Sequence, residues 1–122
     1  MSKKIRNNIN KLLGSEILNV MRKDWDLEIS IKYKNNNYSL NIMTEGSYTD
    51  SWEVDYCYKP NEIVNYINVS ENENKIIIRF YNSEEKAILV IKGIFHNDSD
   101  WDCGGYLCLS CKDLKIYELY YV

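Results

Sequence analysis

The stretch LEISIKYKNNNYSLNI, residues 27–42, decides the fold. Its first half alternates apolar with polar side chains, the apolar ones being Leu27, Ile29, Ile31 and Tyr33. A period of two is typical of a strand with one buried face. Residues 35–37 are three asparagines, which adopt positive φ at low cost, so they predict a tight turn. The alternation then resumes in a returning strand, at Tyr38, Leu40 and Ile42.

Further strands are predicted on the C-terminal side of this hairpin. The same alternation, or a short apolar run, marks residues 52–58, 76–80, 88–91, 106–111 and 115–121. The run at 76–80 is more continuously apolar, which favours a central strand. Residues 60–67 have the pattern of a short helical stretch or a loop.

On the N-terminal side of this hairpin the apolar residues follow a different spacing. Residues 3–13 place Ile5, Ile9, Leu12 and Leu13 on one helical stripe, and Gly14 is a stop signal. Residues 15–23 fit either a helix or a first strand, and their spacing slightly favours a helix. The expected fold class is therefore α+β, a mainly antiparallel sheet of hairpins with an N-terminal helix packed against it.

Length and composition predict one globular domain over residues 1–122. No uninterrupted apolar stretch opens the chain and no run approaches the length of a membrane span, so we expect a cytoplasmic protein with no membrane contact. Its four cysteines should then be reduced.

Charge is unevenly distributed along the chain. Residues 1–23 carry six basic side chains and one acidic one (6 − 1 = +5), whereas residues 24–122 carry nine and seventeen (9 − 17 = −8). A field of this kind bears on partners and association rates. A short basic element beside an acidic body is a poor phosphate-binding surface, so no direct nucleic-acid binding is expected.

The sequence contains candidate ligands for two kinds of metal site. Four zinc-type ligands occur near the C-terminus: His96, Cys103, Cys108 and Cys111. However, Cys108 and Cys111 stand three apart in an expected strand, so they face opposite sides. Residues 98–102 begin like a calcium loop but lack its glycine and final glutamate. The prediction is no metal and no cofactor.

Catalysis has little support in the sequence. His96 is the single histidine, and a pair with Cys103 has no motif around it. No phosphate-cradling glycine-rich loop is present. We therefore predict a protein that is not an enzyme, with a Cys or carboxylate site as the remaining enzymatic alternative.

The tryptophans stand out because each lies beside an acidic residue. Two segments, 45–58 and 97–106, are acidic without a basic residue. Aromatic anchors ringed by carboxylates suit a protein-protein hot spot. The competing interpretation is that the tryptophans cap the core. The predicted partner-binding residues are Glu45, Asp50, Trp52, Glu53, Asp55, Asp98, Asp100, Trp101 and Asp102.

The functional hypothesis is a non-enzymatic intracellular binding protein. It would be an inhibitor or immunity-type protein, as bacteria and phages use for toxin neutralisation, that blocks a basic protein partner such as a nuclease toxin. The alternative is a β-domain that binds carbohydrate or another small ligand through Trp, Tyr, Asn and Asp side chains. The identity of the partner and the oligomeric state do not follow from the sequence.

Overall fold

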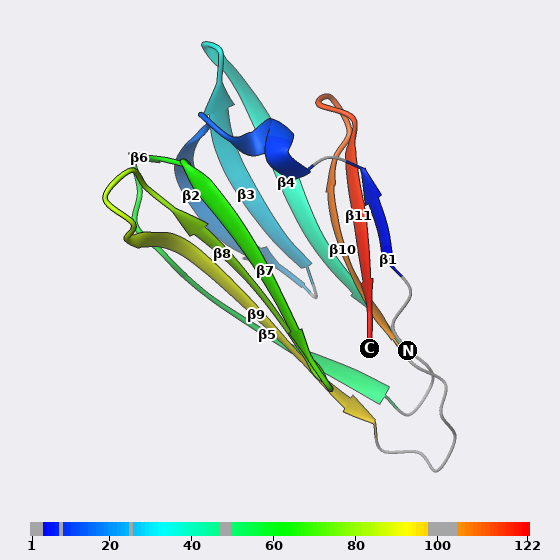
Figure 1. Cartoon of the computed structure of the whole chain (residues 1–122). Coiled ribbons are helices and arrows are strands. Elements are labelled where there is room, and N and C mark those ends of the chain that lie inside the picture. Colours follow the sequence, from blue (N-terminus) through cyan, green and yellow to red (C-terminus); the bar gives the residue numbers. More distant parts are fainter. Residues whose placement is uncertain (1–3, 8, 25, 47–49, 98–104) are drawn as a thin grey trace.

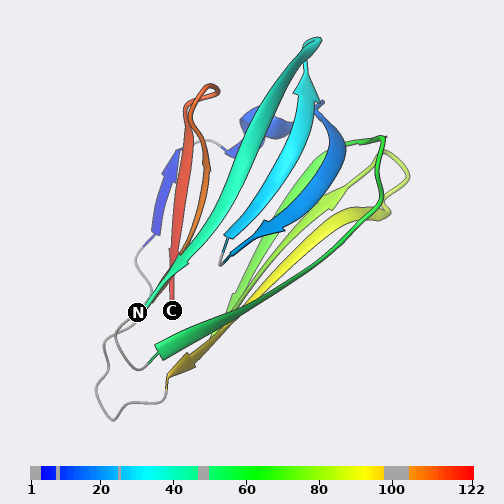
Figure 2. The same cartoon turned by 180° about the vertical axis from the view of Figure 1, so that it is seen from behind.

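The computed structural model describes residues 4–7, 9–24, 26–46, 50–97 and 105–122. Within them the chain forms two antiparallel sheets that lie face to face (Figures 1 and 2). Sheet A has, in spatial order, β1 (Lys4–Asn7), β11 (Ile116–Tyr121), β10 (Tyr106–Cys111), β4 (Asn36–Glu45), β3 (Asp26–Tyr33), β2 (Glu16–Lys23) and β6 (Glu62–Ile63). Sheet B has β5 (Asp50–Tyr58), β9 (Ala87–Asn97), β8 (Lys75–Tyr81) and β7 (Tyr66–Asn72).

The fold is therefore a β-sandwich, and the expected α+β class is wrong. One continuous core fills the space between the sheets. Alternate positions of both sheets supply it, including Ile29 and Leu40 from sheet A and Ile78 and Ile91 from sheet B, each fully buried. Alternation on β3 and β8 is regular, so each strand has one buried and one wetter face.

The hairpin predicted at residues 27–42 is confirmed, with its turn one residue earlier than expected. Lys34 (φ 49°) and Asn35 (φ 66°) form the turn, and β4 begins at Asn36. Positive φ at two successive residues is the type I′ pattern, whose twist matches that of paired strands. The predicted strands at 52–58, 76–80, 88–91 and 106–111 lie within strands of the sandwich, and the one predicted at 115–121 is β11, which begins one residue later.

The predicted N-terminal helix is wrong. Residues 4–7 form β1, which pairs with the edge of β11, and only a single 3-10 turn, η1 (Ile9–Leu12), follows. A lone helix of about eleven residues is marginal in water, whereas a strand gains partners on an open sheet edge. Of the apolar residues that predicted the helix, Leu12 is buried in the core, whereas Leu13 remains partly exposed.

Residues 16–23 of the segment 15–23 form a strand, which is the second of the two predicted possibilities, against the helix that their spacing slightly favours. The pairing of β2 with β3 shifts between Ile17 and Asn19, which is a bulge. The extra residue brings Ile17 and Val20, three apart, to the same buried face. A bulged strand thus imitates the i, i+3 spacing of a helix.

Of the two possibilities predicted for residues 60–67, a short helical stretch or a loop, the helical stretch is absent. Asn61 adopts φ 63° and turns the chain into β6, which pairs with β2 before β7 begins in sheet B. In the part of the chain that the structure describes, no helix has the length and apolar character needed to cross a membrane.

The sandwich is tied together on the side where β2 faces β5. The guanidinium of Arg22 donates to the backbone oxygen of Val54 and lies 5.6 Å from the centre of the Tyr56 ring. The Tyr58 hydroxyl donates to the Asn19 side chain over 2.9 Å. These contacts join the two sheets along the edge strand β5.

Candidate partner-binding surface

Part of the predicted partner site lies outside the described residues. Asp98, Asp100, Trp101 and Asp102 belong to the undescribed segment 98–104, as does the candidate calcium loop. Of Asp50 only the backbone, at the start of β5, is described. The remaining predicted residues are Glu45, Trp52, Glu53 and Asp55.

Trp52 points into the sandwich. Its indole Nε1 donates to the backbone oxygen of Glu45 over 2.9 Å, and its ring lies 5.2 Å from that of Phe95. It packs half-buried against the core. This geometry agrees with the interpretation that the tryptophan caps the core.

Glu53 and Asp55 lie on the opposite face of the same strand, because neighbouring residues of a strand point to opposite sides. Both are exposed on the outer face of sheet B. Glu53 lies 3.2 Å from His96, and Asp55 is in register with Lys92. The structure therefore separates these carboxylates from the indole and sets them beside cationic or titratable groups.

A different aromatic surface covers the outer face of sheet A. We call it the tyrosine face, and it consists of the outward side chains of three neighbouring strands, β4, β10 and β11: Met43, Tyr106, Cys108, Tyr117, Leu119 and Tyr121. The register sets Cys108 between Met43 and Leu119, and Tyr106 between Glu45 and Tyr121. Figures 1 and 2 show no described strand or helix over these three strands on that side.

The tyrosine face combines exposed and buried apolar groups. Met43 and Tyr117 are 45% and 46% exposed, whereas Cys108 and Leu119 are buried between their neighbours. The rings of Tyr106 and Tyr121 lie 5.9 Å apart. A sheet face that is covered only by solvent normally carries polar side chains. Apolar and aromatic groups there are typical of an interaction surface.

Sequence reasoning found Glu45 at the border of this surface but missed its aromatic members. A signal was present, because residues 106–111 and 116–121 have apolar side chains at consecutive rather than alternate positions. Such runs predict strands that bury both faces. On β10 and β11 the inner face packs against sheet B. The outer face belongs to the tyrosine face, over which no described strand or helix lies.

Raised pKa values gather on the tyrosine face. Burial raises the pKa of Tyr106, and the negative charge of Glu45 adds to the effect. Burial also raises the pKa of the Cys108 thiol, partly opposed by the hydrogen bond from Tyr117. The charge that Cys108 would carry, followed by burial, raises the pKa of Tyr117. Tyrosine and cysteine side chains are predominantly neutral at physiological pH, and the raised pKa values of these three groups extend that neutral range to more alkaline pH.

Cys108 and Cys111 do not share a metal site, and the other predicted cysteine ligand, Cys103, lies outside the described residues. Cys108 faces outward and Cys111 lies in the core opposite Ile116. No group of three or more His, Cys, Asp or Glu side chains in the described ranges is placed to hold a metal ion. A raised pKa is the reverse of what a nucleophilic cysteine needs.

A second candidate surface lies near the start of β7. A hollow of about 530 Å³ is lined by Asn65, Tyr66, Asn68, Tyr81, Asn82 and Glu85. The rings of Tyr66 and Tyr81 lie 5.8 Å apart, and Tyr66 is 55% exposed. Aromatic faces beside amide and carboxylate groups suit a small polar ligand.

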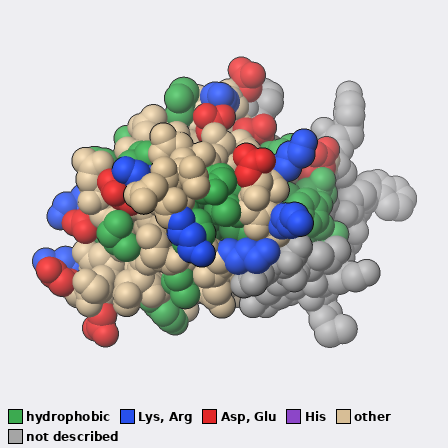
Figure 3. Space-filling model, turned by 90° about the horizontal axis from the view of Figure 1, so that it is seen from above, with side chains coloured by type: hydrophobic (Ala, Val, Ile, Leu, Met, Phe, Trp, Pro, Cys, Tyr) green, Lys and Arg blue, Asp and Glu red, His purple; other side chains and the backbone are tan. Residues whose placement is uncertain are grey.

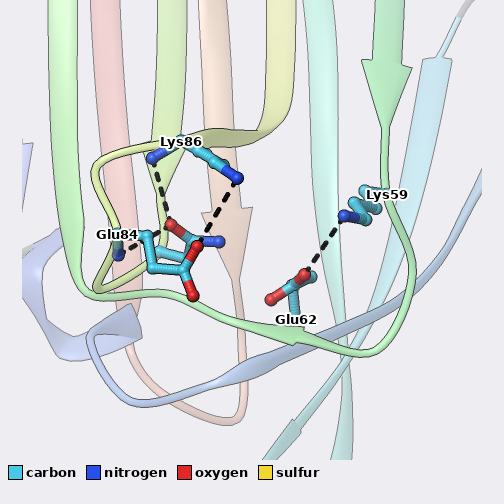
Figure 4. Close-up of polar contacts among 5 residues, drawn as sticks. Lys59, Glu62, Glu84 and Lys86 are labelled. Atoms are coloured by element: carbon cyan, nitrogen blue, oxygen red, sulfur yellow. Dashed lines mark hydrogen bonds and ion pairs between the residues drawn. The ribbon is translucent and has the colours of Figure 1, made fainter.

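The adjoining end of the sandwich carries charges of both signs. Figure 4 shows two ion pairs there: Lys59 with Glu62 at 3.6 Å, and Lys86 with Glu84 at 3.5 Å. The Asn82 side chain accepts hydrogen bonds from the backbone N–H groups of Glu84 and Lys86, which fixes this turn. The view onto this end likewise shows acidic and basic groups interspersed (Figure 3), so no acidic patch forms there.

Comparisons with protein-family models, with curated proteins and with solved structures found no match for this chain.

Proposed function

We propose that this chain is a non-enzymatic binding protein that holds a basic protein partner through the tyrosine face. It would act as an inhibitor or immunity-type protein, covering a functional surface of the partner. The observation that supports this most is the set of apolar and aromatic side chains on the outer face of β4, β10 and β11, with Met43 and Tyr117 nearly half exposed.

The chemistry of the tyrosine face favours a basic partner. Tyrosine rings accept guanidinium and ammonium groups over their faces. Glu45 adds an exposed carboxylate at the border, in register with Tyr106. Because the chain has a net charge of −3, long-range attraction would also speed the encounter with a basic protein.

The two parts of the surface would contribute differently. Met43, Tyr117 and the ring pair of Tyr106 and Tyr121 supply apolar area that a partner removes from water, which is the main source of affinity. Glu45 lies at the rim, where a charge governs association rate and salt dependence more than affinity.

The proposal is tested by comparing matched surface variants. The native protein, the double variant Met43→Ala/Tyr117→Ala and the control Tyr66→Ala would each be used to capture proteins from the source cells. Binding of each captured protein is then measured with purified components. A basic protein that binds the native chain and the control, but binds the double variant at least tenfold more weakly, supports the proposal. Equal binding to all three, or no specific partner, contradicts it.

The salt dependence gives a second readout. Affinity for a basic partner should fall as the salt concentration rises, and Glu45→Gln should reduce that slope. A partner whose affinity is unchanged by salt would contradict the electrostatic part of the proposal.

A second candidate is binding of a saccharide in the hollow beside Tyr66 and Tyr81. It is favoured by the paired rings and by the amides of Asn65, Asn68 and Asn82 around them. Saturation-transfer NMR with a panel of methyl glycosides and disaccharides tests it. Transfer that disappears in Tyr66→Ala but persists in Tyr117→Ala supports saccharide binding, and no transfer from any sugar contradicts it.

A further inference from the structure

The sandwich has four sheet edges, and they are not equally protected. Strand edges offer unpaired backbone groups to other chains, and proteins usually block them with charge, proline, bulges or short length. In sheet A both edge strands are short, since β6 has two residues and β1 has four. These two edges therefore carry such protection.

The edges of sheet B differ sharply from each other. On β5 the outward positions include Glu53 and Asp55, and Arg22 reaches across from β2 to the backbone of Val54. Two copies of β5 paired with each other would bring carboxylates together. Charge and a contact between the sheets therefore protect the edge strand β5 against pairing with another chain.

Strand β7 has less of this protection, and its one charged side chain is Glu71. Its seven residues, YINVSEN, contain no proline and no basic side chain, and its pairing with β8 runs without a register shift from Tyr66 to Asn72. It is one of the two edge strands of sheet B (Figure 1), and no described strand pairs with its second edge. A regular, nearly uncharged edge of this length is suited to strand addition.

We propose that the free edge of β7 pairs with the β7 of a second copy of this chain. The two strands would run antiparallel about a twofold axis at Val69, which joins two four-stranded sheets into one continuous sheet. Antiparallel pairing centred on Val69 places Tyr66 opposite Asn72 of the second copy, and Asn68 opposite Ser70.

This register is self-complementary. On the outer face every opposed pair is uncharged and polar: Tyr66 with Asn72, and Asn68 with Ser70. On the inner face Val69 meets itself, and Ile67 meets Glu71. The strand's one charged residue is therefore not placed opposite its own copy, where like charges would oppose pairing. Tyr66, 55% exposed in the single chain, would gain a neighbour.

Sedimentation velocity over a range of concentrations tests the proposal on the full chain. The native protein should shift from monomer to dimer as concentration rises. The double variant Asn68→Lys/Ser70→Lys should stay monomeric, because each new lysine would face another across the twofold axis. The matched control, Asn37→Lys/Ser39→Lys, adds the same charge to exposed positions of β4 and should associate like the native protein.

A charge-swap experiment separates specific pairing from a general charge effect. Mixing the lysine variant with Asn68→Glu/Ser70→Glu sets lysine opposite glutamate at both positions and should restore the dimer. A native protein that remains monomeric overturns the proposal, as does a dimer that persists in the lysine variant. The proposal is also overturned if the control variant Asn37→Lys/Ser39→Lys fails to dimerise, or if mixing the lysine and glutamate variants does not restore the dimer. None of these results bears on the tyrosine face, which lies on sheet A.

Discussion

The indole Nε1 of Trp52 donates a hydrogen bond to the backbone oxygen of Glu45 and thereby joins β5 of sheet B to the end of β4 in sheet A. Both residues were predicted to contact a partner, and the structure connects them through a contact between the sheets. The ring of Trp52 also lies over Gly93, where an added Cβ would come within 3.1 Å of its Cζ3.

Trp52 should therefore act mainly on stability. Trp52→Phe keeps an aromatic ring and loses the hydrogen bond, which should lower the free energy of unfolding by about 1 kcal/mol. Trp52→Ala also loses the packing against Phe95 and should cost about 3 kcal/mol. Urea unfolding measures both. A Trp52→Ala protein as stable as the native one would show that the indole does not hold the sheets together.

Gly105 lies directly before β10 and close to Phe95 of sheet B. A Cβ at this position would lie 2.5 Å from Cε1 of Phe95 and 2.7 Å from the backbone oxygen of Glu45. Gly105→Ala should therefore lower the free energy of unfolding by about 3 kcal/mol, as overpacking does in a tight core. Gly14→Ala is the contrast, since its Cβ meets no atom within 4 Å and only its φ of 89° is unfavourable. It should cost about 1 kcal/mol. Thermal and urea unfolding of the two variants distinguishes a steric from a conformational cost.

The sequence predicts the strands better than the class of fold. Alternation is a local property, so the hairpin of β3 and β4 is visible in residues 27–42. The N-terminal segment could not be assigned correctly, because its strand form depends on the edge of β11, over a hundred residues away. In β2 the bulge at Ile17 hides the period of two.

The candidate surface was only partly predictable for a related reason. Alternation alone sets Trp52 and Glu53 on opposite faces, so that separation was readable from the sequence. The sequence does not show that Tyr117 and Met43 point outward, because this depends on which face of sheet A packs against sheet B. Glu45 belongs to the surface through its register with Tyr106, which is again a long-range pairing.

The raised pKa of the Cys108 thiol should make stability depend on alkaline pH. The folded state holds this proton more tightly than the unfolded chain, whose thiol has its ordinary pKa of 9.0. The contribution is complete below pH 9 and is lost as pH rises through the higher folded pKa. Urea unfolding between pH 8 and 10.5 should show declining stability, with a shallower decline in Cys108→Ala. The raised pKa values of Tyr117 and Tyr106 also make stability decline at alkaline pH, and both tyrosines remain in Cys108→Ala. An identical slope in both proteins would contradict the assignment.

The three described thiols should react at very different rates. Cys57 is exposed on β5, whereas Cys108 and Cys111 are buried. In a Cys103→Ser background at pH 8, a thiol reagent such as dithionitrobenzoate should modify one cysteine rapidly, and peptide mapping should identify it as Cys57. The other two should react only in denaturant. Rapid modification of Cys108 would show that the tyrosine face does not shield its thiol.

Glu118 places a carboxylate inside the sandwich, 1% exposed, where the Tyr120 hydroxyl donates to its Oε2 over 2.5 Å. Removing one member of such a pair leaves a buried polar group with a lost partner, so Glu118→Ala should cost about 2 kcal/mol. Glu118→Gln keeps an acceptor oxygen and should cost less. A double-mutant cycle with Tyr120→Phe isolates the contact, and we expect a coupling energy of about 1 kcal/mol from urea unfolding. Additive effects of the two substitutions would show that the hydrogen bond does not contribute, and that the core tolerates each group independently of the other.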